Sequence, residues 1–173
     1  MKKRIIALGL LWCLSAVMLQ AARVDTVLVR SAAMNKDVKV VYVLPDKAIG
    51  KQACPVVYLL HGYGGNARSW VQLKPELPQM ADEKGIIFVC PDGKNSWYWD
   101  SPENPAYRYE TFVTSELVKY TDGNYATIPD SKARAISGLS MGGHGALWSA
   151  IRHKDVFGAA GSMSGGVDIR PFP

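Results

Sequence analysis

Cysteine and histidine are scarce in this chain, with three of each among 173 residues. So few cysteines exclude a disulfide-dense scaffold, and no spacing of cysteine and histidine resembles a metal site, so we expect no bound metal. The sequence also lacks internal repeats and low-complexity tracts, which excludes a collagen or a disordered tail protein. Hydrophobic residues make up 48% and charged residues 20%, the balance of a globular domain with a proper core.

Long apolar runs are missing as well, except at the N-terminus. Residues 2–4 are basic, residues 5–19 are almost wholly apolar, and residues 20–22 supply small side chains where a signal peptidase can cut. This layout predicts a secretory signal over residues 1–22 and an exported protein, periplasmic or secreted, with its domain over residues 23–173. A membrane span is the alternative, but the run is shorter than the roughly 20 residues that a span needs, so we expect no stable membrane insertion after cleavage.

An excess of charge of one sign is also absent once this segment is set aside. The formal net charge is +5, from 20 Lys and Arg against 15 Asp and Glu. Three of the basic residues, Lys2, Lys3 and Arg4, belong to the predicted signal. No basic stripe remains in the rest of the chain, so we expect no nucleic-acid partner.

The rest of the sequence alternates between apolar runs that suit strands and amphipathic stretches that suit helices. Unbroken apolar runs at residues 55–60 and 86–90 are typical of central parallel strands that are covered on both faces. The other expected strands are residues 24–30, 38–44, 133–137 and 157–163, and the expected helices are residues 76–84, 109–120 and 142–153. This order predicts an α/β fold with a mainly parallel sheet and helices on both faces.

The strongest motif is the Gly-x-Ser-x-Gly sequence at residues 138–142, between an expected strand and an expected helix. Such a setting is that of a nucleophile elbow, in which Ser140 is exposed on a sharp corner. The flanking glycines have no Cβ and leave the corner unobstructed. A glycine-rich helix start with an inert serine is the alternative, because the pattern alone also occurs by chance.

A second glycine-rich segment, residues 61–65 (His-Gly-Tyr-Gly-Gly), directly follows the strand expected at residues 55–60. A backbone N–H in such a loop can point at a reacting carbonyl oxygen and, with the N–H of Met141, form an oxyanion hole. We expect the loop donor to be Tyr63, with Gly62 as the neighbouring possibility. Phosphate binding is the alternative use of a glycine-rich loop, but this spacing matches no phosphate-binding motif.

Residues 138–146 (GLSMGGHGA) resemble the elbow of the putative-esterase family of α/β hydrolases. That family includes S-formylglutathione hydrolases, feruloyl esterases, acetylxylan esterases and mycolyltransferases. Other matching stretches are residues 61–65, 91–93, 95–98 and 116–130. The resemblance implies an α/β-hydrolase fold and a serine carboxylic ester hydrolase that needs no cofactor, with Ser140 as nucleophile and the backbone amides of Tyr63 and Met141 as oxyanion donors.

The sequence departs from the family after the elbow. Such enzymes order their triad as Ser, then Asp or Glu, then His, but residues 141–173 contain only the acids Asp155 and Asp168 and the histidines His144 and His153. We interpret His144 as a packing residue on the helix behind the serine, and His153 lies near the far end of that helix. We therefore expect an N-terminal fragment, truncated after about the sixth strand and almost inactive by itself.

An aromatic loop, residues 91–108, leaves the end of the sheet where open α/β folds bind ligands. Its aromatic faces suit an acyl or sugar pocket, with a packed lid as the alternative. The residues expected to bind substrate are Trp97, Trp99, Tyr107, His61 and Gly62. His61 is also interpreted as a brace for the glycine-rich loop.

Export favours a particular class of substrate, namely acyl or feruloyl esters of plant polysaccharides, over cytosolic S-formylglutathione. The expected partner is therefore a small-molecule or polysaccharide ester. An acyltransferase on the same scaffold is one alternative, since it would share every motif and differ only in excluding water. The other alternative is a non-catalytic relative of the hydrolases that binds carbohydrate through the aromatic loop, because the triad is incomplete.

Overall fold

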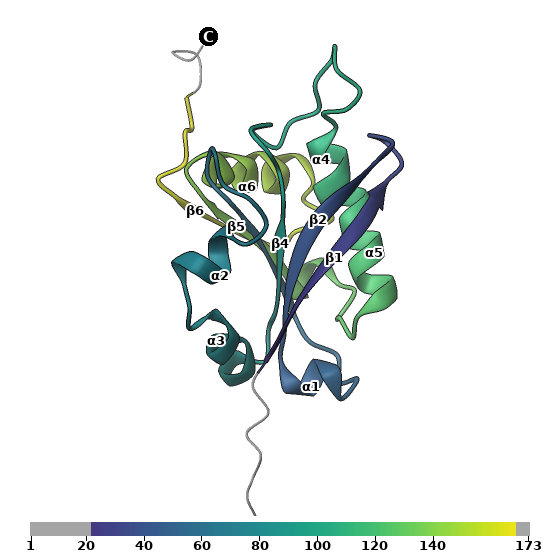
Figure 1. Ribbon diagram of the computed structural model, residues 1–173, viewed down its shortest axis with the longest axis vertical. Helices are drawn as coiled ribbons and strands as arrows, with labels where there is room; N and C mark the ends of the chain where they lie inside the picture. The colour runs from purple at the N-terminus through teal and green to yellow at the C-terminus, as the bar shows by residue number, and fades with distance from the viewer. Residues whose placement is uncertain (1–21, 169–173) are drawn as a thin grey trace, which may run out of the picture.

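A mixed six-stranded sheet forms the centre of the computed structural model, which describes residues 22–168 (Figure 1). The strands are β1 (Arg23–Ser31), β2 (Lys36–Leu44), β3 (Val56–Leu60), β4 (Ile87–Pro91), β5 (Arg134–Leu139) and β6 (Ala159–Met163), in the spatial order β1-β2-β4-β3-β5-β6. β1 pairs antiparallel with β2, and β2 pairs antiparallel with β4. The pairs β3–β4, β3–β5 and β5–β6 are parallel, which confirms the predicted α/β fold.

Helices lie on both faces of the sheet, as the sequence predicts (Figure 1). They are α1 (Asp46–Ile49), α2 (Ser69–Leu73), α3 (Leu77–Lys84), α4 (Tyr109–Thr111), the π-helical turn η1 (Phe112–Glu116), α5 (Leu117–Asn124), the 3₁₀ turn η2 (Ser131–Ala133) and α6 (Met141–Arg152). The segment from α4 to α5 is the helix expected at residues 109–120, extended by one turn and widened by η1. The sequence did not predict α1 and α2, which are only four and five residues long.

Two hydrophobic clusters cover the two faces of the sheet. Tyr42 and Tyr58 pack in the cluster on the side of α4, α5 and α6. Val41 and Leu59 pack in the other cluster, which includes Trp70 of α2 together with residues of α3. Successive side chains of a strand point to opposite faces, so neighbours such as Val41 and Tyr42 belong to different clusters. The unbroken apolar runs of the sequence therefore mark strands that are buried on both sides.

β6 forms one edge of the sheet. Within residues 22–168 it pairs with β5 alone, and four of its five residues are exposed. It begins at Ala159 rather than at Phe157, because the Phe157 N–H donates to the carbonyl oxygen of His153 in the turn that follows α6. An unpaired strand edge is a site for further strand pairing.

The signal expected at residues 1–22 lies outside the described residues apart from Ala22, and it stays a prediction. Between residues 22 and 168, no helix is long and apolar enough to cross a membrane.

A buried ion pair anchors the start of β5 to the end of α5. The Arg134 guanidinium, of which 6% is exposed, donates to the Asp122 carboxylate at 2.6 Å and to the carbonyl oxygen of Val156 at 3.0 Å. We predict that Asp122→Ala lowers the free energy of unfolding by roughly 3 kcal/mol, because it leaves a buried cation without its counter-ion. Urea unfolding measures this change.

The matched control for this prediction is Asp37→Ala. Asp37 pairs with Arg30 at 3.5 Å, and more than half of each side chain is exposed. Surface pairs of this kind contribute less than about 1 kcal/mol. Equal losses in the two variants would contradict the assignment of the Arg134–Asp122 pair as a buried anchor.

Candidate active site

Ser140 occupies the corner between β5 and α6 and is exposed. Its backbone angles are φ 55° and ψ −116°, in the left-handed half of conformational space that residues with a Cβ rarely adopt. The Ser140 N–H donates to the carbonyl oxygen of Met163 at 2.8 Å, and the carbonyl oxygen of Ser140 accepts from the His144 N–H at 3.0 Å. The corner is therefore fixed by backbone hydrogen bonds on both sides, with the serine side chain directed outward from a strained turn.

The two glycines of the motif allow a close approach of α6 to the sheet. A Cβ on Gly142 would overlap the carbonyl oxygen of Leu60, at the end of β3. A Cβ on Gly138 would overlap the backbone of Gly142 itself. The spacing in the sequence is thus a steric requirement of this corner.

The glycine-rich loop after β3 lies beside the serine. A Cβ built on Gly62 would contact the Ser140 Cβ at 3.6 Å. Met141 is the first residue of α6, so its N–H has no acceptor within the helix. Among the hydrogen bonds of residues 22–168, neither the Met141 N–H nor the Tyr63 N–H donates to a protein group. The two amides that the sequence assigns to the oxyanion hole are therefore free of protein acceptors; Met141 directly follows the exposed serine, and Tyr63 follows Gly62, the loop residue that lies against it.

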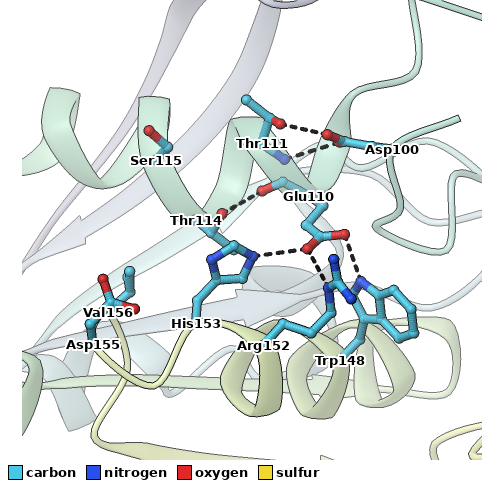
Figure 2. Close-up of a pocket in the computed structure, with 10 residues that line it drawn as sticks. All are labelled: Asp100, Glu110, Thr111, Thr114, Ser115, Trp148, Arg152, His153, Asp155 and Val156. Carbon is cyan, nitrogen blue, oxygen red and sulfur yellow. Dashed lines mark hydrogen bonds and ion pairs between the residues drawn. The ribbon is translucent and has the colours of Figure 1, made fainter. Parts of the chain in front are cut away.

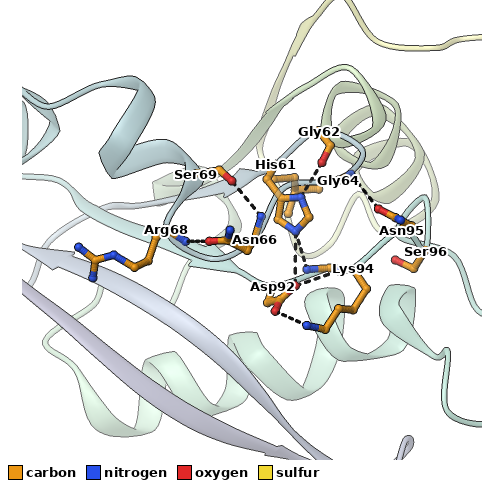
Figure 3. A network of polar contacts seen from close by, with 12 residues as sticks. His61, Gly62, Gly64, Asn66, Arg68, Ser69, Asp92, Lys94, Asn95 and Ser96 are labelled. Carbon is orange, nitrogen blue, oxygen red and sulfur yellow. Dashed lines mark hydrogen bonds and ion pairs between the residues drawn. The ribbon is translucent and has the colours of Figure 1, made fainter.

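His61 lies behind this loop and is buried (Figure 3). Its Nδ1 is 2.7 Å from the carbonyl oxygen of Gly62, and its Nε2 accepts from the Gly93 N–H at 2.9 Å. Since Nε2 accepts a hydrogen bond, Nδ1 carries the proton and the ring is neutral. Both ring nitrogens are thus occupied, and the geometry corresponds to the brace rather than to direct contact with a substrate.

Asp92 adjoins this network, and the sequence analysis did not single it out. Its carboxylate accepts from the Lys94 N–H at 3.1 Å and from the Lys94 ammonium at 2.8 Å. The His61 Nε2 is 3.7 Å away, too far for a hydrogen bond. Burial alone would raise the pKa of Asp92, but the nearby His61 ring and the Lys94 contacts hold that pKa well below its usual value. The carboxylate therefore stays ionised beneath the loop.

No general base adjoins the serine within residues 22–168. None of the hydrogen bonds of this segment joins the Ser140 hydroxyl to a histidine or to an acid. His144 is buried, and its Nδ1 is 2.8 Å from the carbonyl oxygen of Gly166. His153 is 2.9 Å from Glu110 at the other end of α6. These positions agree with the interpretation of both histidines as unsuitable bases.

The three aromatic residues expected to bind substrate do not all line the same cavity. Trp99 and Tyr107 line a cavity of about 360 Å³ next to the glycine-rich loop, together with Asn95, Ser96, Asp100, Ser101, Pro102 and Asn104. Trp97 is not among the residues of that cavity, but both Trp97 and Trp99 pack edge-on against His144 of α6, with ring centroids 5.5 and 5.3 Å apart. The structure therefore brings Trp99 and Tyr107 together in one cavity and brings Trp97 and Trp99 together at His144.

A larger cavity than that of Trp99 and Tyr107 lies elsewhere, at the C-terminal end of α6 (Figure 2). It measures about 540 Å³ and surrounds Glu110, which accepts hydrogen bonds from Trp148, Arg152 and His153 at 2.7, 2.8 and 2.9 Å. Burial favours a higher pKa for Glu110, but these three donors lower it. A helix of 12 residues is about 18 Å long, so this cavity is remote from Ser140. We therefore place the candidate active site at the nucleophile elbow and not at this cavity, although the cavity is large.

The parallel strands, the flanking helices and the serine elbow together define an α/β hydrolase. The family model described as "Putative esterase" matches residues 31–173, and the chain belongs to that family.

Similar proteins include esterases and acyl-transferring enzymes. An acetyl esterase of Caldicellulosiruptor saccharolyticus is 29% identical over 136 residues, which is 73% of this chain and 50% of the relative. The diacylglycerol acyltransferase/mycolyltransferase Ag85A of Mycobacterium gordonae is 34% identical over 155 residues, covering 84% of this chain and 43% of that protein. A solved ferulic acid esterase superposes with a TM-score of 0.75 at 31% identity, over 86% of this chain and 62% of its own. The chain thus spans about half the length of the curated relatives it matches.

Replacement of Ser140 tests whether the corner is strained. We predict that Ser140→Gly is more stable than Ser140→Ala by about 1 kcal/mol, because both variants lack the hydroxyl but only glycine adopts φ 55° without a Cβ penalty. Urea unfolding of the two variants measures the difference. Equal stabilities, or a more stable alanine variant, would show that the corner holds no strain.

Proposed function

We propose that this protein is an exported serine carboxylic ester hydrolase in which Ser140 forms an acyl-enzyme. The Ser140 Oγ attacks the ester carbonyl carbon, the C–O bond to the alcohol breaks, and the alcohol leaves. Water then attacks the acyl-enzyme and releases the acid. The observation that carries the proposal is an exposed serine on a strained corner, next to two backbone amides without a protein acceptor.

The amides of Tyr63 and Met141 supply the electrostatic part of this mechanism. In the tetrahedral intermediate the carbonyl oxygen carries a negative charge, and two fixed N–H donors stabilise that charge more than they stabilise the neutral ester. Met141 also begins α6, so the positive end of the helix dipole adds to the effect. The base that takes the serine proton is not among residues 22–168, and the mechanism requires one from outside this segment.

We further propose that the substrate is an acyl or feruloyl ester of a polysaccharide. The cavity lined by Trp99 and Tyr107 supports this proposal, because it combines aromatic faces with the polar groups of Asn95, Ser96 and Asn104. The names of two similar proteins, an acetyl esterase and a ferulic acid esterase, point to the same class of substrate. Export rests on the predicted signal at residues 1–22.

An acyltransferase is the second candidate, and the similarity to the mycolyltransferase of Mycobacterium gordonae favours it. Such an enzyme would use the same nucleophile and the same oxyanion donors, and an alcohol would replace water in the second step. Products formed in the presence of added alcohols distinguish the two reactions, because a transferase yields the new ester and a hydrolase yields the free acid.

A fluorophosphonate probe tests the proposed nucleophile. We predict that the probe labels Ser140 in the complete protein, which must also supply the general base, and that Ser140→Ala abolishes labelling, as identified by tandem mass spectrometry. The control variant is Ser115→Ala, an exposed serine in η1, and it should be labelled like the wild type. Absence of label on Ser140 in the folded, complete protein would favour the non-catalytic, carbohydrate-binding alternative.

A further inference from the structure

Three hydrogen bonds tie the glycine-rich loop to the segment after β4, residues 92–98, which we name the clamp segment. The Gly93 N–H donates to the His61 Nε2 at 2.9 Å, and the Gly64 N–H donates to the Asn95 Oδ1 at 2.8 Å (Figure 3). The His61 N–H donates to the Tyr98 hydroxyl at 3.0 Å. These contacts lie on both sides of Tyr63, so the clamp segment holds the loop before and after the proposed oxyanion donor.

Tyr98 is itself held rigidly. Its side chain is fully buried, and its ring packs so closely on Gly93 and Gly145 that a Cβ on either glycine would overlap it. Its hydroxyl accepts from the His61 N–H and also donates to the His61 carbonyl oxygen at 3.3 Å. Burial raises the pKa of Tyr98 well above its usual value, so the phenol keeps the proton that it needs to donate.

The backbone of the clamp segment is strained at this point. Trp97 and Tyr98 have φ of 55° and 59°, so two consecutive residues with bulky side chains lie in the left-handed region. Each such residue costs about 1–2 kcal/mol, and the conformation persists only where the surrounding structure enforces it. Strain at two consecutive residues of a segment that holds the loop beside Ser140 indicates a positional demand on that segment.

We infer that Tyr98 is a positioning residue, which fixes the Tyr63 amide relative to Ser140 through His61, and that Asn95 is the second point of the same clamp. The inference rests on the proposed function, since it assigns a role within the oxyanion hole. An oxyanion donor must be fixed to within a few tenths of an ångström, because a poorly placed hydrogen bond stabilises the transition state no better than water does. Neither residue contacts the reacting atoms in this account.

The test compares Tyr98→Phe and Asn95→Ala with two matched controls, Tyr120→Phe and Asn124→Ala. Tyr98→Phe keeps the ring between its two glycines and removes only the hydroxyl. The two controls alter α5, where Tyr120 is partly buried against the hydrophobic core and Asn124 is exposed. For each variant of the complete protein we would measure the fluorophosphonate reaction at Ser140 over a range of probe concentrations, which separates the maximal rate of labelling from the apparent affinity for the probe. Amide signals of Tyr63 and Gly64 would be followed by NMR, with urea unfolding to measure stability.

The expected result for Tyr98→Phe is a maximal rate lower by about tenfold to a hundredfold, with apparent affinity changed less than about twofold. The Tyr63 amide signal should shift, and the Gly64 amide, which does not contact Tyr98, should exchange faster. Asn95→Ala should show the same shift of the Tyr63 signal with a smaller loss of maximal rate, and little loss of stability because Asn95 is exposed. Its apparent affinity does not enter the comparison, since Asn95 also lines the proposed substrate cavity. It therefore provides the test if Tyr98→Phe fails to fold.

One outcome would overturn the inference, and another would overturn the proposed function while the inference is still tested. If the clamp variants lose stability but keep the wild-type rate and the wild-type Tyr63 signal, Tyr98 and Asn95 are structural only and the inference is wrong. If the wild-type complete protein is not labelled at Ser140, the proposed function fails. The NMR comparison then decides the positioning role by itself, since it needs no reaction.

Discussion

The close approach of α6 to the carboxyl end of β3 is the constraint on which the rest of the site depends. The helix reaches the sheet only because Gly142 has no Cβ to meet the carbonyl oxygen of Leu60. The same approach forces Ser140 into the left-handed region and exposes it, and it places the first N–H of the helix beside that serine. Because the glycine-rich loop begins where β3 ends, it is brought against the corner by the same contact.

The rest of the fold holds this corner from several directions. The Ser140 N–H donates to Met163 at the end of β6, and Glu110 binds the opposite end of α6 through Arg152 and His153. The clamp segment holds the glycine-rich loop from the side of β4. A helix fixed at both ends can maintain a strained residue at its N-terminus, since relaxation of that residue would require the whole helix to move.

Sequence patterns predicted the parts of the structure that depend on local chemistry. The apolar runs predicted β3 and β4 because both faces of these strands are buried, and the spacing of glycine and serine predicted the elbow because the corner has a steric requirement. α2 was missed because it is short and depends on a tertiary contact, the hydrogen bond from the Trp70 indole to the carbonyl oxygen of Leu60. The meeting of Trp97 and Trp99 at His144 also depends on tertiary packing.

Contacts of the site between residues that are far apart in the sequence could not be predicted from such patterns. Tyr98 follows His61 by 37 residues, and nothing in the local sequence of either indicates that they meet. Of the two glycines that contact the Tyr98 ring, Gly93 lies in the same segment, but Gly145 lies in α6, 47 residues further along the chain than Tyr98. Partners that are brought together by the topology of the sheet can be assigned only after the strand order is known.

The central claim is that Ser140 and the amides of Tyr63 and Met141 form one oxyanion-binding unit. It is tested most directly by NMR of ¹⁵N-labelled protein before and after a fluorophosphonate reacts with the serine, because the phosphonyl oxygen then occupies the place of the oxyanion. The account predicts that the Tyr63 and Met141 amide protons both move downfield and exchange more slowly in the adduct. An adduct on Ser140 that leaves both amide signals where they were would contradict it.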